Sequence, residues 1–153
     1  MGKHSSSMQI TRAADYAVRA MIYLANLPAG ERVMLPNLAS GIGAPESFLS
    51  KVLQSLCRAR LVKSHRGQSG GFEILKSGRT ATIAVVISAV DGPVRLNVCL
   101  VNADLCDRRL HCAAHPVWAK AQAAMLKMLD KDSIAELAAR SAATFRPNSY
   151  DNS

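Results

Sequence analysis

Three cysteines and one histidine lie close together in the second half of this 153-residue chain. Six residues separate Cys99 from Cys106, five separate Cys106 from Cys112, and two separate Cys112 from His115. Thiolates and imidazoles are ligands for iron–sulfur clusters, zinc and copper(I). Pro116 suits the first turn of a helix, and the N-terminus of a helix stabilises a nearby thiolate. The spacing therefore predicts a segment that binds a metal or a cluster, or that reacts with oxidants.

The spacing leaves several alternatives open. Structural zinc sites usually contain a closer cysteine pair, with about two to four residues between them, and the chain has none. A zinc site, a disulfide switch and three unrelated thiols are the alternatives to a cluster, and His111 competes with His115 as the imidazole. Cys57 follows Leu56 in an apolar pattern and is expected to be a small core residue. Without a Cys-x-x-Cys pair or a nucleotide-binding glycine motif, a redox enzyme is disfavoured.

The composition is that of a globular domain: 49% of the residues are apolar and 20% are charged. No run of about eighteen apolar residues occurs, and Met1 to Met8 lack the apolar centre of a signal peptide. We therefore expect a cytoplasmic protein without a membrane segment. The net charge of +8 favours a polyanionic partner such as nucleic acid.

Two short helical patterns around a turn predict a helix-turn-helix. The first covers Leu35 to Ser40, Gly41 to Ala44 form the turn, and Pro45 opens the second helix. The apolar face of the second helix comprises Phe48, Leu49, Val52, Leu53 and Leu56. Its polar face comprises Ser47, Ser50, Lys51, Gln54 and Arg58. A recognition helix brings such polar side chains to base edges and phosphates in the major groove of DNA.

A hairpin is predicted next, with strands at Leu61–His65 and Phe72–Leu75 and three glycines in the connection 66–71. Between Phe48 and Phe72 there are five Lys or Arg residues and no Asp or Glu. A stretch of one charge sign suits a surface that follows the phosphates. The hairpin residues predicted to contact DNA are His65, Arg66 and Gln68.

Helices are also predicted before and after this unit. Thr11 can cap a first helix, which has an apolar face of Ala14, Ala17, Val18, Met21, Leu24 and Ala25. A third apolar helix covers Thr82 to Val90, and Ser133 with Glu136 forms a capping box for a last helix to about Arg140.

A long helix is predicted from Pro116 to about Leu129, with one face of Trp118, Ala121, Met125, Met128 and Leu129. Such a face predicts a dimer contact, and packing against its own domain is the alternative. The expected organisation is a disordered extension at 1–7, a DNA-binding domain at 8–92, a sensor loop at 93–114, dimerisation and terminal helices at 115–142, and a flexible tail at 143–153.

Several segments, in the right order, resemble the Rrf-two family of winged-helix transcription regulators, typified by IscR and NsrR. They are residues 8–25, Leu61–Gly71, Ile83–Gly92, the three-cysteine segment and Ser133–Leu137. The resemblance covers about residues 8–138. It implies a mostly α-helical winged helix-turn-helix with a small β-hairpin wing and a long C-terminal dimerisation helix, acting as a homodimer on double-stranded DNA with a palindromic operator.

The resemblance also implies an iron–sulfur cluster held by Cys99, Cys106 and Cys112, with 2Fe-2S favoured over 4Fe-4S. In the IscR branch the fourth ligand is a histidine, which would be His115. In the NsrR branch it is an aspartate from the first helix of the partner subunit, which would be Asp15. The chain departs from the IscR pattern at two points: the first cysteine spacing is one residue longer, and Ser50 stands where that branch has a base-reading glutamate.

The resulting expectation is a DNA-binding transcriptional regulator, with repression as the favoured mode and no enzymatic activity. Its operator affinity would depend on an iron–sulfur cluster or on the redox state of the cysteine loop. A regulator with a zinc site or a thiol switch and no cluster is the alternative, and a small redox enzyme is the distant one.

Overall fold

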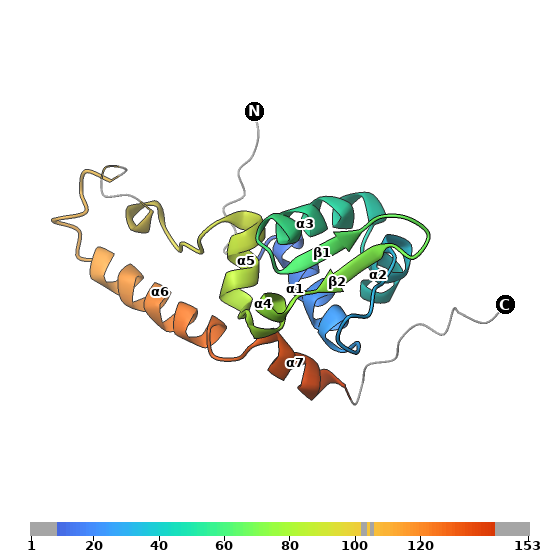
Figure 1. Ribbon diagram of the computed structural model, residues 1–153. Coiled ribbons are helices and arrows are strands. Elements are labelled where there is room, and N and C mark those ends of the chain that lie inside the picture. Colours follow the sequence, from blue (N-terminus) through green and yellow to red (C-terminus); the bar gives the residue numbers. More distant parts are fainter. Residues whose placement is uncertain (1–8, 102–103, 105, 143–153) are drawn as a thin grey trace.

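The computed structural model describes residues 9–101, 104 and 106–142, so the predicted extension at 1–7 and tail at 143–153 lie outside the described residues. The fold class is confirmed: the chain is mostly helical, with a two-stranded antiparallel hairpin on one side of the helices (Figure 1). The elements are α1 (Arg12–Ala25), α2 (Leu35–Ile42), α3 (Glu46–Arg58), β1 (Val62–His65), β2 (Gly71–Ile74), α4 (Lys76–Thr80), α5 (Ile83–Asp91), the 3-10 helix η1 (Val98–Leu100), α6 (His115–Leu129) and α7 (Ile134–Ser141). Among the described residues, no helix combines the length and apolarity of a membrane span.

The core forms around α1, which α2, α3, α5 and α7 all contact. Thr11 caps α1 as predicted, since its side-chain oxygen accepts a hydrogen bond from the Ala14 N–H. Small buried side chains on α1 allow its neighbours to approach closely. The core includes Ala17, Ala20, Met21 and Leu24 of α1, Leu49, Leu53 and Leu56 of α3, Val86 of α5 and Ile134 of α7. The predicted Ser133–Glu136 capping box of α7 is also present. Thr82, predicted as the first residue of the third helix, is instead the N-cap of α5.

The turn between α2 and α3 lies later than predicted. Helix α2 continues through Gly41 to Ile42, and Gly43 ends it in the left-handed conformation, with a φ of 69°. Pro45 was predicted to be the first residue of the second helix. It is instead the N-cap of α3, which begins at Glu46. Gly41 has a packing role, because a Cβ there would lie 2.5 Å from the ring of Tyr23 on α1. The prediction assigned this glycine to the turn because the sequence alone does not show that contact.

The hairpin is tied to the segment before α2. Strands β1 and β2 pair from Val62 opposite Ile74 to His65 opposite Gly71. On the outer side of β2, Val33 and Phe72 exchange backbone hydrogen bonds of 3.0 and 2.8 Å. The Arg32 guanidinium donates to the Ser69 carbonyl at 3.2 Å. These bonds fix the orientation of the hairpin relative to the helix-turn-helix.

Replacing Arg60 with glycine is expected to raise the free energy of unfolding by about 0.5–1 kcal/mol. Arg60 ends α3 with a φ of 58°, and the N–H groups of Arg60 and Leu61 donate to the carbonyls of Cys57 and Leu56. Glycine removes the steric strain that a Cβ causes at this left-handed position. This gain is partly offset because glycine raises the conformational entropy of the unfolded chain. Urea denaturation measures the change. Arg60→Ala keeps the Cβ and should give no gain, so equal gains in both variants would assign the effect to charge instead.

Candidate nucleic-acid interface and cysteine site

The polar face of α3 is open to solvent on the side away from the core. Ser47, Lys51, Gln54 and Arg58 are exposed, and Ser50 is half-buried. The opposite face is buried as predicted, apart from Phe48, which is 40% exposed. Phe48 lies at the N-terminal end of α3, where its ring packs edge-on against Tyr16 with centroids 5.6 Å apart. Phe48 therefore lies at the edge of the apolar face, against Tyr16 of α1, while its neighbour Leu49 is fully buried.

A groove of about 340 Å³ separates α3 from the hairpin. It is lined by Ser50, Gln54, Cys57, Arg58, Ser64 and Phe72. The Arg58 guanidinium is held there by a 2.9 Å hydrogen bond to the Ser55 hydroxyl. Burial raises the pKa of the Cys57 thiol, and hydrogen bonds with Ser64 partly oppose this. Cys57 is half-buried, so it packs against the core, as expected, and also lines the groove.

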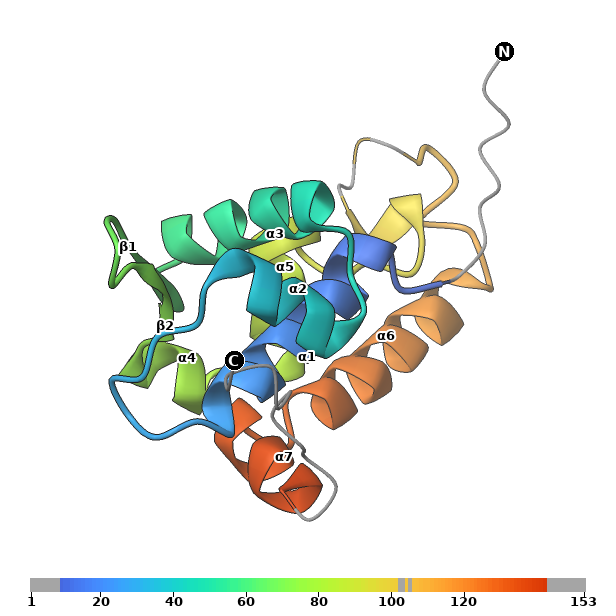
Figure 2. The same cartoon turned by 90° about the vertical axis from the view of Figure 1, so that its right-hand side faces the viewer.

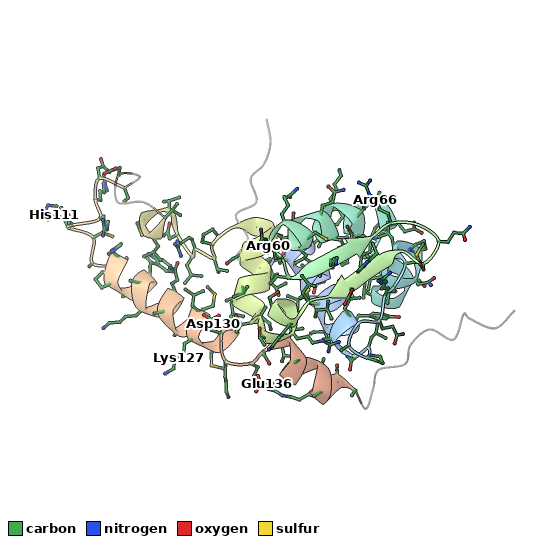
Figure 3. The ribbon with its side chains drawn as sticks, viewed as in Figure 1. Arg60, Arg66, His111, Lys127, Asp130 and Glu136 are labelled. Atoms are coloured by element: carbon green, nitrogen blue, oxygen red, sulfur yellow. The ribbon has the colours of Figure 1, made fainter. Side chains whose placement is uncertain are left out.

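The predicted wing residues have different surroundings. Arg66 and Gln68 are exposed in the connection between the strands. Arg66 follows β1 and Arg60 precedes it, so the two arginines lie at opposite ends of this strand (Figure 3). His65 instead faces Glu73 of the neighbouring strand, with 2.7 Å between Nε2 and Oε2, and its side chain is only 15% exposed. This contact holds the two strands together and turns the imidazole away from solvent.

The three cysteines of the loop and His115 line one cavity of about 100 Å³. Cys99 lies on η1, Cys106 and Cys112 lie in the following loop, and His115 is the first residue of α6. Cys99 is buried, Cys106 is half-buried and Cys112 is exposed. The remaining lining residues are Asn97, Val98, Arg109 and Trp118. The sequence predicted the four donor residues as a group, and it did not single out Arg109.

His115 has an unusual environment within this cavity. Its Nδ1 atom is buried and has no hydrogen-bond partner among the described residues. A buried polar atom without a partner is costly and points to a missing ligand or solvent atom. His111, the competing imidazole, is exposed and is not among the residues lining the cavity. Figure 3 shows it at the outer end of the loop.

The donor atoms are gathered but not assembled. In residues 9–101, 104 and 106–142, no three His, Cys, Asp or Glu side chains converge closely enough to hold a metal ion. Asp15, the alternative fourth ligand, lies on α1 and is not among the residues lining the cavity. Its carboxylate forms a 2.7 Å ion pair with Arg19, one turn later. The three thiols and His115 therefore fit a cluster by type and location, and the loop must contract to bind one.

Hydrogen bonds connect both ends of α5 to other elements. At its C-terminal end, where the cysteine loop begins, the Asp91 carboxylate accepts a hydrogen bond from the Thr11 hydroxyl at the start of α1. At its N-terminal end, the Thr82 hydroxyl donates to the Asp130 carboxylate at 2.6 Å, just after α6. Because α5 also packs against α3, it joins the loop and α6 to the recognition helix.

The long helix α6 lies outside the core, beside the other helices, with the cysteine loop at its N-terminal end (Figures 1 and 2). None of its residues is buried. The predicted apolar face divides into two rows. Trp118, Gln122, Met125 and Leu129 lie toward the loop and α5, and Gln122 accepts a 3.0 Å hydrogen bond from the Leu96 N–H. Val117, Ala121, Ala124 and Met128 form a second, exposed row, in which Val117 is 64% and Met128 68% exposed.

Comparisons with known proteins agree with this architecture. The family described as "Rrf2: Iron-dependent Transcriptional regulator" matches residues 10–140. The chain is 36% identical over 131 residues to Rv1287 of Mycobacterium tuberculosis (strain H37Rv), whose name provisionally assigns it as an HTH-type transcriptional regulator. The alignment covers 86% of this chain and 81% of that protein. A protein of the CDC 1551 strain, MT1325, gives the same match and carries the same assignment.

Solved structures share the fold. CymR (YrzC), the global cysteine regulator of B. subtilis, matches with a TM-score of 0.71 and 24% identity over 88% of this chain and 98% of that one. IscR of T. potens matches with a TM-score of 0.72 and 22% identity, over 94% of this chain and 96% of that one. The oxidized form of Staphylococcus aureus CymR matches with a TM-score of 0.67 and 20% identity, over 86% of this chain and 96% of that one.

The relatives are transcriptional regulators and not enzymes, as predicted. The family match spans nearly all of the described residues, from the cap of α1 to the last turn of α7. The chain therefore belongs to the Rrf2 (Rrf-two) family of DNA-binding transcriptional regulators.

Proposed function

We propose that this regulator is a cytoplasmic homodimer, acting as a repressor, whose affinity for a palindromic operator depends on a 2Fe-2S cluster. Cys99, Cys106 and Cys112 would hold the cluster, with His115 as the fourth ligand. The observation that supports this proposal is that these four side chains line a single cavity. Thiolates and imidazole together form a ligand set that suits iron in such clusters.

His115 is favoured over the partner subunit's Asp15 as the fourth ligand. The buried Nδ1 atom of His115 lacks a partner among the described residues, and ligation would satisfy it. The Asp15 carboxylate already has a partner in Arg19, which ligation would remove. When bound, a cluster would supply a link between η1, the loop and the start of α6 that is sensitive to redox state and to iron supply.

Helix α5 would couple the cysteine loop to the DNA-binding surface. The loop starts directly after Asp91, whose carboxylate binds the cap of α1, and the far end of α5 is tied to Asp130 after α6. A contraction of the loop would therefore pull on a helix that packs against α3. The state of the loop can change DNA affinity only by as much as it favours one orientation of the recognition helices.

The recognition surface comprises the α3 polar face and the hairpin. We propose that Ser47, Ser50, Lys51 and Gln54 lie near bases, and that Arg58, Arg66 and Gln68 bind the backbone or the minor groove. The inward orientation of His65 supports a role in holding the wing against Glu73 rather than in contacting DNA. In a symmetric dimer two such surfaces face two half-sites, which accounts for the palindromic operator.

Replacing Val117 and Met128 together with serine is expected to weaken dimerisation about 100-fold or more. These residues belong to the exposed row at 117, 121, 124 and 128, whose alternating steps of four and three are those of a helix–helix seam. An isologous contact would bury both side chains twice. Full burial of one such side chain contributes about 1.5–3 kcal/mol, so even partial burial of the four copies reaches the roughly 2.7 kcal/mol of a 100-fold change. Sedimentation velocity over a dilution series measures the change.

A matched control removes an apolar side chain elsewhere. Leu110 lies in the cysteine loop and is 86% exposed. Leu110→Ser should leave the dimer constant within about three-fold of the wild-type value, since the proposed seam does not include it. A wild-type chain that remains monomeric at micromolar concentration would contradict the dimer. If Leu110→Ser weakened dimerisation as much as the double variant, the interface would include the loop instead of the proposed seam alone.

Two observations favour the alternative of a zinc site or a thiol switch without a cluster. No three donors converge among the described residues, and Cys112 is exposed, as suits a thiol that reacts directly. Anaerobic purification followed by absorption spectroscopy and native mass spectrometry separates the alternatives. A coloured protein whose added mass is that of two irons and two sulfides, absent in Cys106→Ala, is expected. A colourless protein with one zinc, or with no added mass, would overturn the cluster.

A further inference from the structure

The cysteine cavity contains a cation that the proposed function does not use. Arg109 lines the cavity together with the three thiols, and its side chain is half-buried. Its backbone N–H donates to the Cys106 carbonyl at 3.3 Å, so a turn holds the arginine beside that cysteine. Arg108, the preceding residue, is exposed and is not among the lining residues. Two neighbouring arginines therefore differ in position: Arg109 lines the cavity and Arg108 lies outside it.

A guanidinium is charged at every physiological pH, and a partly enclosed site screens its field less than open water does. A cleft lined by one sign of charge raises the local concentration of the opposite ion and the rate at which it associates. Among the described lining residues, Arg109 is the one with a permanent charge, and none is an Asp or Glu. The cavity should therefore attract anions to the thiols.

We infer that Arg109 makes the cysteine site selective for anionic thiol-reactive molecules, with carboxylate-bearing low-molecular-weight disulfides as their class. The thiolate of Cys112 or Cys106 attacks one sulfur of the small disulfide after losing its proton to solvent. The sulfur–sulfur bond of the reagent breaks, a mixed disulfide with the protein forms, and the other half leaves as a thiolate. No further oxidant is required, since the reagent itself is reduced. Buried Cys99 is shielded from this reaction.

This inference deepens the proposed function, because modification of these thiols would remove the ligands of the cluster. It is tested on the reduced apoprotein, so a chain that binds no cluster can still confirm it, and a cluster-binding chain can still contradict it.

The test compares the reaction rates of a full-length Cys57→Ser background with three disulfides: dianionic dithiobis(nitrobenzoate), neutral dithiodipyridine and cationic cystamine. Arg109→Gln should lower the ratio of the dianionic to the neutral rate about three- to ten-fold and raise the cationic rate relative to the neutral one. Arg109→Lys should keep most of the wild-type ratio. Arg108→Gln is the matched control and should change the ratio less than about two-fold. In about 1 M salt the difference between the variants should disappear.

Two results would overturn the inference. Equal changes in Arg108→Gln and Arg109→Gln would show a general effect of net charge without selectivity in the cavity. A rate that changes by the same factor for all three reagents in Arg109→Gln would show that the arginine supports the fold of the loop and does not select by charge.

Discussion

Raising the salt concentration from 50 to 200 mM is expected to weaken DNA binding about 10³–10⁵-fold. Basic side chains that bind phosphates release condensed counterions, and the effect is this large for about six to ten bound phosphates. The net charge of +8 and the exposed Lys51, Arg58 and Arg66 on one surface provide such binding in a dimer. Fluorescence anisotropy of a labelled duplex at several salt concentrations measures the slope, which should lie between about −5 and −9 on logarithmic axes.

Two variants separate the contributions of phosphates and bases. Lys51→Gln should reduce the steepness of the slope by about one for each phosphate that the variant no longer neutralises, and weaken all sequences alike. Ser47→Ala leaves the charge unchanged, so it should change the preference among sequences without changing the slope. DNA binding that does not respond to salt would contradict the proposed electrostatic surface.

Substituting Gly78 with alanine is expected to destabilise the protein by about 3 kcal/mol or more. Gly78 is buried in α4, and a Cβ there would lie 2.2 Å from the Leu61 carbonyl oxygen and 2.9 Å from side-chain atoms of Ile74 and Met21. The Leu61 carbonyl also accepts a hydrogen bond from the Leu75 N–H, so the backbone cannot easily move away. Thermal and urea unfolding measure the decrease in stability.

The sign of this effect makes it a strict test. By helix propensity alone, Gly78→Ala would stabilise α4 by about 1 kcal/mol. Lys76→Ala introduces the same residue at an exposed position of the same helix, and it should change stability by less than about 0.5 kcal/mol. A gain in stability from Gly78→Ala would show that the close packing of α4 against the hairpin is wrong.

Local signals in the sequence predict most of the fold. The caps at Thr11 and Ser133 depend on residues within three positions of each other, so the sequence alone identifies them. The glycine-rich connection between two short apolar segments likewise identifies the hairpin. Helix α4 was not predicted, since its five residues have no apolar period and it is held by contacts distant in sequence.

The failures have tertiary causes. Gly41 lies inside α2, where the ring of Tyr23 packs over it. The α6 face divides into two rows because the cysteine loop folds back onto one of them at Gln122. Each of these contacts joins residues far apart in the chain, which periodicity cannot show.

For the candidate site, the sequence predicted which residues take part better than it predicted how their side chains are arranged. The soft ligands marked the cysteine segment, and the structure gathers them around one cavity. Sequence spacing did not distinguish Arg109 from Arg108, or show that His65 faces Glu73. Those distinctions depend on side-chain direction within loops and hairpins, which requires the folded chain.

If the state of the cysteine cavity sets DNA affinity, as proposed, the affinity should differ between the cluster-bound and the cluster-free protein. A labelled duplex selected from a random-sequence pool is titrated anaerobically with the protein as purified, with the same protein after removal of its cluster by chelation, and with Cys106→Ala. We expect the first two affinities to differ about 5–150-fold, the usual range of coupling between sites, and the affinity of Cys106→Ala to match that of the depleted protein. Affinities equal within two-fold in all three samples would contradict it, since the protein would then bind DNA regardless of its cysteines.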